Sequence, residues 1–147
     1  MATTIGFLGA GHLGSAIISG MLADGASGFT AKHIHATCKS AASAAYLKQA
    51  HGINAHTDNR KLVADSDYII LGVKPVQMKA VLDELADCNL DDKIIITLAA
   101  GIRIEHYRRI LGDDAIIIRA MPNVAASLQA SLTGIYSDDD LDPSEED

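Results

Sequence analysis

The chain has 147 residues, which suits one domain with its own hydrophobic core. Its net charge of −7 is local: seven of the 19 acidic residues lie from Asp138 onward, and the part before them holds 12 acidic and 12 basic residues. A neutral body with only 4% aromatic residues gives no indication of nucleic-acid binding. No apolar run approaches the roughly 20 residues that span a bilayer, so no membrane association is expected. Cys38 and Cys88 have neither disulfide nor metal spacing, which favours free thiols in the cytoplasm.

Strand and helix patterns alternate along the chain. In chain order they are the strand TTIGFLGAG, the helix SAIISGMLADG, the strand HIHATC, the helix SAASAAYLKQAHG, the strand INAH, the helix NRKLVAD, the strand DYIILGVK, the helix PVQMKAVLDELAD, the strand KIIITLAAG, the helix RIEHYRRILG and the strand AIIIRAMPN. Ser40 is expected to cap the second helix, Gly52 to follow its end, and Pro75 to open the fourth.

Three of the predicted strands contain continuous apolar runs, Ile69–Leu71, Ile94–Ile96 and Ile116–Ile118. Such runs are typical of strands buried on both faces of a parallel sheet. The strand–helix unit recurs about six times, which predicts an α/β fold with a doubly wound, mainly parallel, Rossmann-type sheet of strand order 3-2-1-4-5-6. Residues 1–136 are expected to form this Rossmann-type domain, and residues 137–147 an acidic linker or the start of a further helix.

The clearest chemical motif is a Gly-x-Gly-x-x-Gly loop, which consists of Gly9, Ala10, Gly11, His12, Leu13 and Gly14. It lies between the first strand and an amphipathic helix, which is the context of a dinucleotide-binding loop. The first glycine permits a tight turn, the second lets a pyrophosphate approach the backbone, and the third allows close packing of helix and strand. The alternative is a glycine turn without a ligand. The side chain of His12 would lie near the pyrophosphate or face solvent.

The end of the second strand bears on the choice of cofactor; it contains Thr37, Cys38, Lys39 and Ser40. Sites for NAD usually place a carboxylate here to bind the ribose 2′-hydroxyl. This chain has none, and a lysine with two hydroxyl groups favours a 2′-phosphate, so NADP(H) is expected over NAD(H). The alternative is that Lys39 is only solvated and Ser40 only caps a helix. His33, His35 and Cys38 have no fourth partner in the pattern, so no metal site is predicted.

Four segments, IGFLGAGHLGSAIISGML, LGVKPVQM, TLAAGI and RAMPN, occur in the order and spacing of pyrroline-5-carboxylate reductases. The chain resembles this family over essentially its whole length. Its members are oxidoreductases that reduce a cyclic imine to L-proline with NAD(P)H, the last step of proline biosynthesis. The resemblance adds further cofactor-binding candidates, namely Asn59, Val73, Lys74, Pro75, Ala99, Ala100 and Gly101, and a substrate-side loop of Met121, Pro122 and Asn123. It implies that Asn59 lies near the adenosine and Lys39 near the 2′-phosphate.

Two loops depart from the family pattern. His12-Leu13 replaces the usual Asn-Met of the glycine loop, and Val124-Ala125 replaces the usual Thr-Pro after Met-Pro-Asn. In the family, a stretch like GIYSDDDLDPSEED leads into more of the dinucleotide domain. A helical second domain then builds the oligomer and carries the hydroxyl residue proposed to protonate the imine nitrogen.

The resemblance therefore implies a truncated reductase whose substrate is a small imine. No catalytic residue is identifiable in this chain, and we expect it to bind cofactor with little or no reductase activity alone. Other interpretations remain: a complete domain with an acidic terminus, a non-catalytic NADP-binding or interaction module, or the cofactor domain of another NADP-dependent reductase. The last group includes relatives of hydroxy-acid dehydrogenases and F420-dependent NADP reductases.

Overall fold

The computed structural model describes residues 2–23 and 28–121, and the backbone of residues 134–136. Each predicted strand and helix is present. In chain order the elements are β1 (Ile5–Leu8), α1 (His12–Ala23), the 3₁₀ turn η1 (Ala31–His33), β2 (Ile34–Thr37), α2 (Ala41–His51), β3 (Asn54–His56), α3 (Asn59–Ala64), β4 (Tyr68–Leu71), α4 (Pro75–Leu85), β5 (Ile94–Thr97), α5 (Ile104–Leu111), β6 (Ile116–Met121) and β7 (Gly134–Tyr136). No helix in these ranges is long and apolar enough to cross a membrane.

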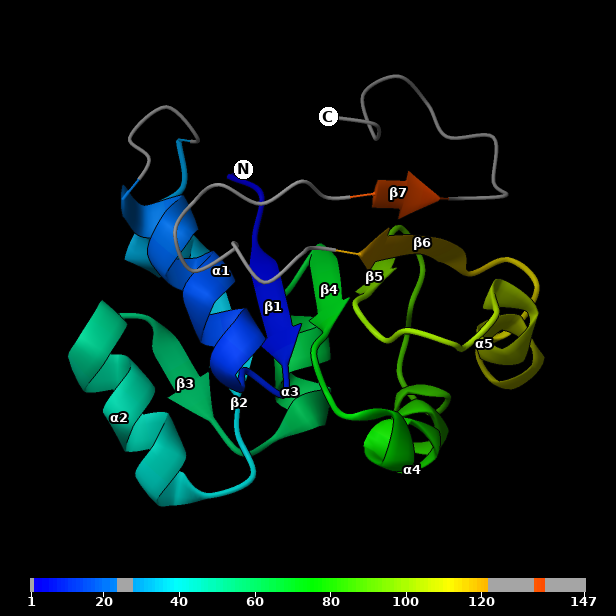
Figure 1. Cartoon of the computed structure of the whole chain (residues 1–147), viewed down its shortest axis with the longest axis horizontal. Helices are drawn as coiled ribbons and strands as arrows, with labels where there is room; N and C mark the ends of the chain where they lie inside the picture. The colour runs from blue at the N-terminus through cyan, green and yellow to red at the C-terminus, as the bar shows by residue number, and fades with distance from the viewer. Residues whose placement is uncertain (1, 24–27, 122–133, 137–147) are drawn as a thin grey trace.

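The strands form one sheet of order β3-β2-β1-β4-β5-β6-β7 (Figure 1). The first six are parallel, so the predicted order 3-2-1-4-5-6 is confirmed. The seventh strand was not predicted; it pairs antiparallel with β6, with Arg119 opposite Tyr136. Ile5 of β1 is in register with Ile34 of β2 and Tyr68 of β4, so the strand order reverses at β1. The glycine loop follows β1 and therefore lies at the topological switch point, as predicted.

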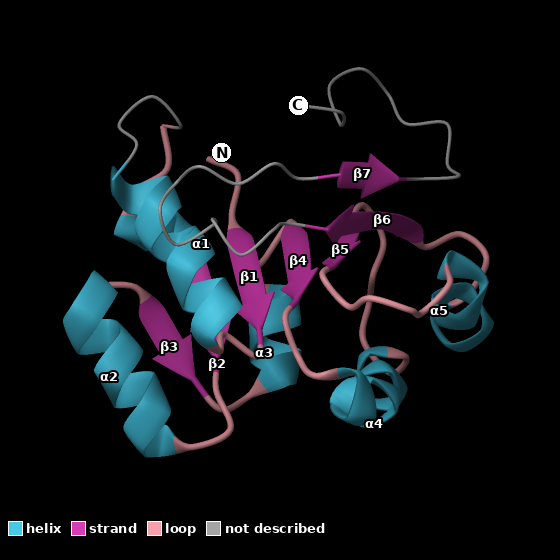
Figure 2. Cartoon of the chain, in the orientation of Figure 1, coloured by secondary structure: helices cyan, strands magenta, loops and turns pink. Residues whose placement is uncertain are grey.

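Helices cover both faces of the sheet and bury two apolar layers (Figure 2). Phe7 packs in the layer with Ile18 of α1, whereas the next residue, Leu8, packs in the layer with Met78 of α4. The continuous apolar runs behave as expected, because Ile69 and Ile70 are 0% and 8% exposed although they point to opposite faces.

The ends of the helices follow local signals in the sequence. The Ser40 hydroxyl accepts a hydrogen bond of 3.2 Å from the Ser43 amide and caps α2, which ends at Gly52 in a left-handed conformation with φ of 70°. The Asp58 carboxylate caps α3 in the same way, and Pro75 opens α4. These helices begin directly after β2, β3 and β4, so their starts lie together at the carboxyl ends of the parallel strands, which form one edge of the sheet.

Candidate functional site

The glycine loop leaves no room for a side chain at its first position. Gly9 has a φ of +77°, and a Cβ built there would lie 2.4 Å from Cγ1 of Val73 and 3.2 Å from its amide nitrogen. Gly72, which follows β4, is also close to this loop, since a Cβ there would lie 2.9 Å from the Gly9 carbonyl oxygen. The loops after β1 and β4 therefore touch through backbone, and glycine at position 9 is required by both space and conformation.

The second and third glycines differ in the space around them. A Cβ at Gly11 would meet nothing within 4 Å, so there is space for a ligand beside this residue, whose own amide donates to the Gly9 carbonyl oxygen at 2.8 Å. A Cβ at Gly14 would lie 3.4 Å from Cβ of Ala10 and 3.8 Å from the Phe7 ring, where helix and strand pack closely. Helix α1 begins at His12, which is exposed, and its first turn contains no acidic residue. Its free amides and positive dipole end are thus available to an anion.

The end of β2 lies beside this loop. The Ala10 amide donates to the Thr37 carbonyl oxygen at 3.1 Å, and the Cys38 amide donates to the His56 carbonyl oxygen at 3.0 Å. Burial raises the pKa of the Cys38 thiol, which keeps it neutral. Lys39 is exposed and adds a positive charge at the end of β2.

Two predicted site residues at this edge already have protein partners. The Ser40 hydroxyl caps α2 and lies 3.0 Å from the Ser43 hydroxyl, so the helix-capping alternative describes one role of this residue. Nδ2 of Asn59 donates to Oε2 of Glu84 at 2.9 Å and joins the start of α3 to α4. The resemblance alone did not indicate this bond, because Glu84 lies 25 residues further along the chain.

The two loops predicted to complete the site lie at the same edge of the sheet. The Gly72 amide donates to the Leu8 carbonyl oxygen at 2.8 Å, and the Leu98 amide donates to that of Leu71 at 3.1 Å, so the strand ladder continues past the strand ends. Of the predicted residues after β4, Val73 and Lys74 lie in the loop and Pro75 begins α4; Lys74 and Pro75 are exposed. The loop after β5 consists of Ala99, Ala100 and Gly101, of which Ala99 is buried.

The substrate-side loop is described only at its start. Met121 ends β6 and is 54% exposed, whereas Pro122 and Asn123 lie outside the described residues. Sequence reasoning did not single out two buried hydroxyl groups near this edge: the Thr97 and Tyr107 oxygens lie 2.6 Å apart. The available signal was a hydroxyl residue at the end of an apolar strand and a tyrosine on the buried side of α5.

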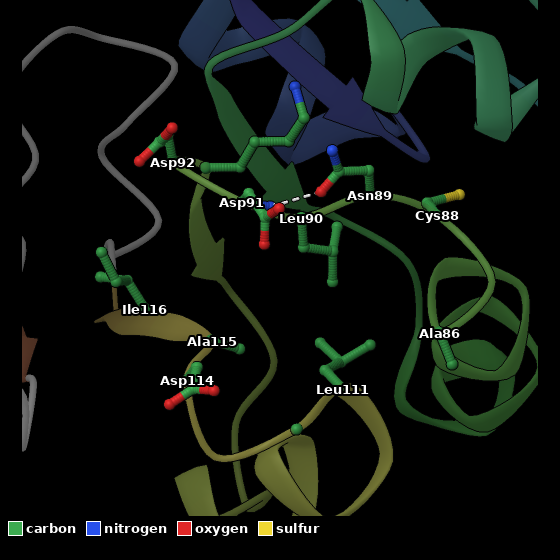
Figure 3. Close-up of a pocket in the computed structure, with 12 residues that line it drawn as sticks. Ala86, Cys88, Asn89, Leu90, Asp91, Asp92, Leu111, Asp114, Ala115 and Ile116 are labelled. Carbon is green, nitrogen blue, oxygen red and sulfur yellow. Dashed lines mark hydrogen bonds between the residues drawn. The ribbon is translucent and has the colours of Figure 1, made fainter.

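A hollow of about 770 Å³ lies at the opposite edge of the sheet, at the ends of α4 and α5 (Figure 3). Asp91 and Asp92 precede β5 and Asp114 precedes β6, so three of the four charged residues in its lining are acidic and the fourth is Lys93. None of the predicted cofactor residues lines it, and carboxylates would repel a dinucleotide's phosphates. The described ranges contain no group of three or more His, Cys, Asp or Glu side chains that could hold a metal ion.

The sheet is doubly wound, and the glycine loop lies at its switch point, directly before the N-terminus of α1. No carboxylate in the first turn of α1 neutralises the positive end of that helix. These features define a dinucleotide-binding domain of the Rossmann type. Residues 4–101 match the family described as NADP oxidoreductase coenzyme F420-dependent, and the chain belongs to this family.

Among curated proteins, the chain is similar to the pyrroline-5-carboxylate reductases of Escherichia coli (35% identical over 135 residues) and Vibrio alginolyticus (33% over 133 residues). The alignments cover 92% and 90% of this chain but 49% and 48% of those proteins. The solved pyrroline-5-carboxylate reductase of Coxiella burnetii matches with a TM-score of 0.90 and 30% identity, over 99% of this chain and 53% of that one. A Plasmodium falciparum pyrroline carboxylate reductase with NADP bound has the same fold (TM-score 0.83, 22% identity, over 98% and 51% of the two chains). The chain therefore spans about half the length of these relatives.

Proposed function

We propose that this chain is the NADP(H)-binding portion of a pyrroline-5-carboxylate reductase, which reduces a cyclic imine to L-proline. The observation that carries the cofactor role is the glycine loop at the switch point. A side chain at Gly9 would collide with Val73, whereas the space around Gly11, directly before the start of α1, is free. The similarity to curated pyrroline-5-carboxylate reductases supports the imine as substrate.

In this proposal the chain binds and orients, and the nicotinamide supplies the hydride when bound. The residues fit such a cofactor, since there is space for a ligand beside Gly11 and the first turn of α1 has no carboxylate. Backbone of Ala99–Gly101 and of the loop that starts at Met121 would lie beside the nicotinamide. Holding the reacting carbons roughly 3–3.5 Å apart is the main contribution of such positioning groups.

We also propose a preference for NADPH over NADH, based on the charge at the end of β2. Lys39 is exposed there, and the segment Thr37–Ser40 contains no carboxylate. We expect Lys39→Glu to weaken NADPH binding by roughly tenfold or more and to reduce or reverse the preference, because a charged hydrogen bond to the 2′-phosphate is replaced by repulsion. Calorimetric or fluorescence titration with both nucleotides measures the effect.

Lys32→Glu is the matched control for this variant. Lys32 is exposed and precedes β2, at the opposite edge of the sheet from Lys39, so the same change of charge is made away from the cofactor site. We expect it to leave both affinities unchanged. Equal affinities of the unaltered chain for NADPH and NADH, with no response to Lys39→Glu, would contradict the proposed preference.

A second candidate is hydride transfer between NADP(H) and coenzyme F420, which the description of the matching family favours. The two candidates can be separated by joining the chain in frame to the second half of the Escherichia coli relative. The joined protein is given NADPH with either pyrroline-5-carboxylate or oxidised F420. NADPH consumption with the imine supports our proposal, and consumption with F420 alone supports the second candidate.

We place the boundary of the cofactor domain after residue 136, where β7 ends, and assign residues 137–147 to an acidic linker or the start of a further helix. The free thiols of Cys38 and Cys88 support a cytoplasmic location. Assembly into an oligomer is implied by the resemblance to the reductases.

A further inference from the structure

A buried pair of hydroxyl groups connects α5 to the loop after β5. Tyr107 is 0% exposed, and its hydroxyl oxygen lies 2.6 Å from Oγ1 of Thr97, the last residue of β5. Oγ1 of Thr97 in turn accepts a hydrogen bond of 3.3 Å from the amide of Ala99. Two consecutive hydrogen bonds therefore connect a helix on one face of the sheet to the first residue of the Ala99–Gly101 loop.

Packing alone does not account for a tyrosine at this position. A phenylalanine would fill the same apolar space in the layer with Ile104 and Ile117, without a hydroxyl group to satisfy. Burial raises the pKa of Tyr107, although the bond to Thr97 and the charge of Arg119 act in the opposite direction. The phenol therefore stays protonated and available for hydrogen bonding near neutral pH.

The Ala99–Gly101 loop, at the end of this series of hydrogen bonds, begins with a buried and hydrogen-bonded residue and continues with exposed ones. Ala99 is 7% exposed and its amide points inward to Thr97, whereas Ala100 and Gly101 are exposed. Gly101 has a φ of +78°, so the loop turns in a conformation that glycine allows. The inward bond of the Ala99 amide thus fixes the orientation of the peptide from which the exposed part of the loop continues.

We infer that Tyr107 is a positioning residue for the nicotinamide end of the cofactor, acting through Thr97 on the Ala99–Gly101 loop. This inference rests on the proposed cofactor role. It assigns the tyrosine hydroxyl no contact with the cofactor. Its effect is confined to the nicotinamide half, because the glycine loop and Lys39 follow other strands, β1 and β2.

The test compares two ligands, NADPH and 2′,5′-ADP, which carries the adenosine and 2′-phosphate but no nicotinamide. We expect Tyr107→Phe to weaken NADPH binding by roughly three- to tenfold, the effect of losing one hydrogen bond that orders the site, and to leave 2′,5′-ADP binding unchanged. Tyr46→Phe is the matched control, because Tyr46 is 66% exposed on α2, and it should change neither affinity. Thermal melting checks that both variants are folded.

Variants of Thr97 give an independent comparison that stands even if Tyr107→Phe does not fold. Thr97→Ser keeps the hydroxyl and should retain NADPH affinity. Thr97→Val keeps the shape without the hydroxyl and should weaken NADPH binding while leaving 2′,5′-ADP binding unchanged. An equal loss for both ligands, or no loss for NADPH, would overturn the inference. If the unaltered chain binds neither ligand, the proposed cofactor role itself is wrong, which is a different result from a tyrosine without effect.

Discussion

Incubated with NADPH and pyrroline-5-carboxylate, the 147 residues alone are expected to bind the cofactor but to oxidise it close to the background rate. Imine reduction needs a proton donor for the nitrogen, and removing a general acid costs roughly 10²–10⁴-fold. Near the Ala99–Gly101 loop, the hydroxyl groups of Thr97 and Tyr107 are buried and bonded to each other, so neither is placed to protonate a substrate. The chain also spans only about half the length of the curated reductases it resembles.

The measurement is the rate of NADPH oxidation, compared between this chain and the same chain joined to the second half of the Escherichia coli relative. A rate for the joined protein that exceeds that of the 147 residues by at least roughly 100-fold would agree with the expectation. NADPH titration of the 147-residue chain is the control that tests whether it is folded and binds cofactor. Robust turnover by the 147 residues would show that this chain contains its own proton donor.

Replacing Gly11 by alanine is expected to lower NADPH affinity by roughly 10- to 100-fold while leaving the melting temperature unchanged. An added Cβ meets no atom within 4 Å, and Gly11 has no left-handed φ, so the free protein accommodates the methyl group. In the complex, that methyl group occupies the space through which a pyrophosphate would approach the start of α1. Each lost hydrogen bond to a charged phosphate costs about 1.5–3 kcal/mol.

Gly9→Ala is the matched variant with the opposite signature. Its φ of +77° and the 2.4 Å approach to Cγ1 of Val73 predict a destabilisation of about 2–5 kcal/mol, from backbone strain and overpacking together. Calorimetric titration and thermal melting of both variants separate the two effects. If Gly11→Ala binds NADPH as the unaltered chain does, no pyrophosphate lies against this loop and the cofactor site must be placed elsewhere.

Much of the architecture could be predicted because its signals are local. Continuous apolar runs such as Ile94–Ile96 indicate burial on both faces, and Ser40 and Pro75 mark helix starts by groups that act within one turn. The glycine loop is local in the same sense, since its spacing between a strand and a helix already predicts an anion site. Once strands and helices alternate, chain connectivity leaves few possible strand orders, and the one expected is the one observed.

The partners of distant residues were decided only by the tertiary structure. Val73 and Gly9 are 64 positions apart in sequence, yet Val73 takes the space that a side chain at the first loop position would need. The bonds of Asn59 to Glu84 and of Tyr107 to Thr97, and the antiparallel pairing of β7 with β6, belong to the same class. A sequence pattern reports that a residue is buried or that a helix begins. It does not report which group lies opposite, because that depends on how whole elements pack against the sheet.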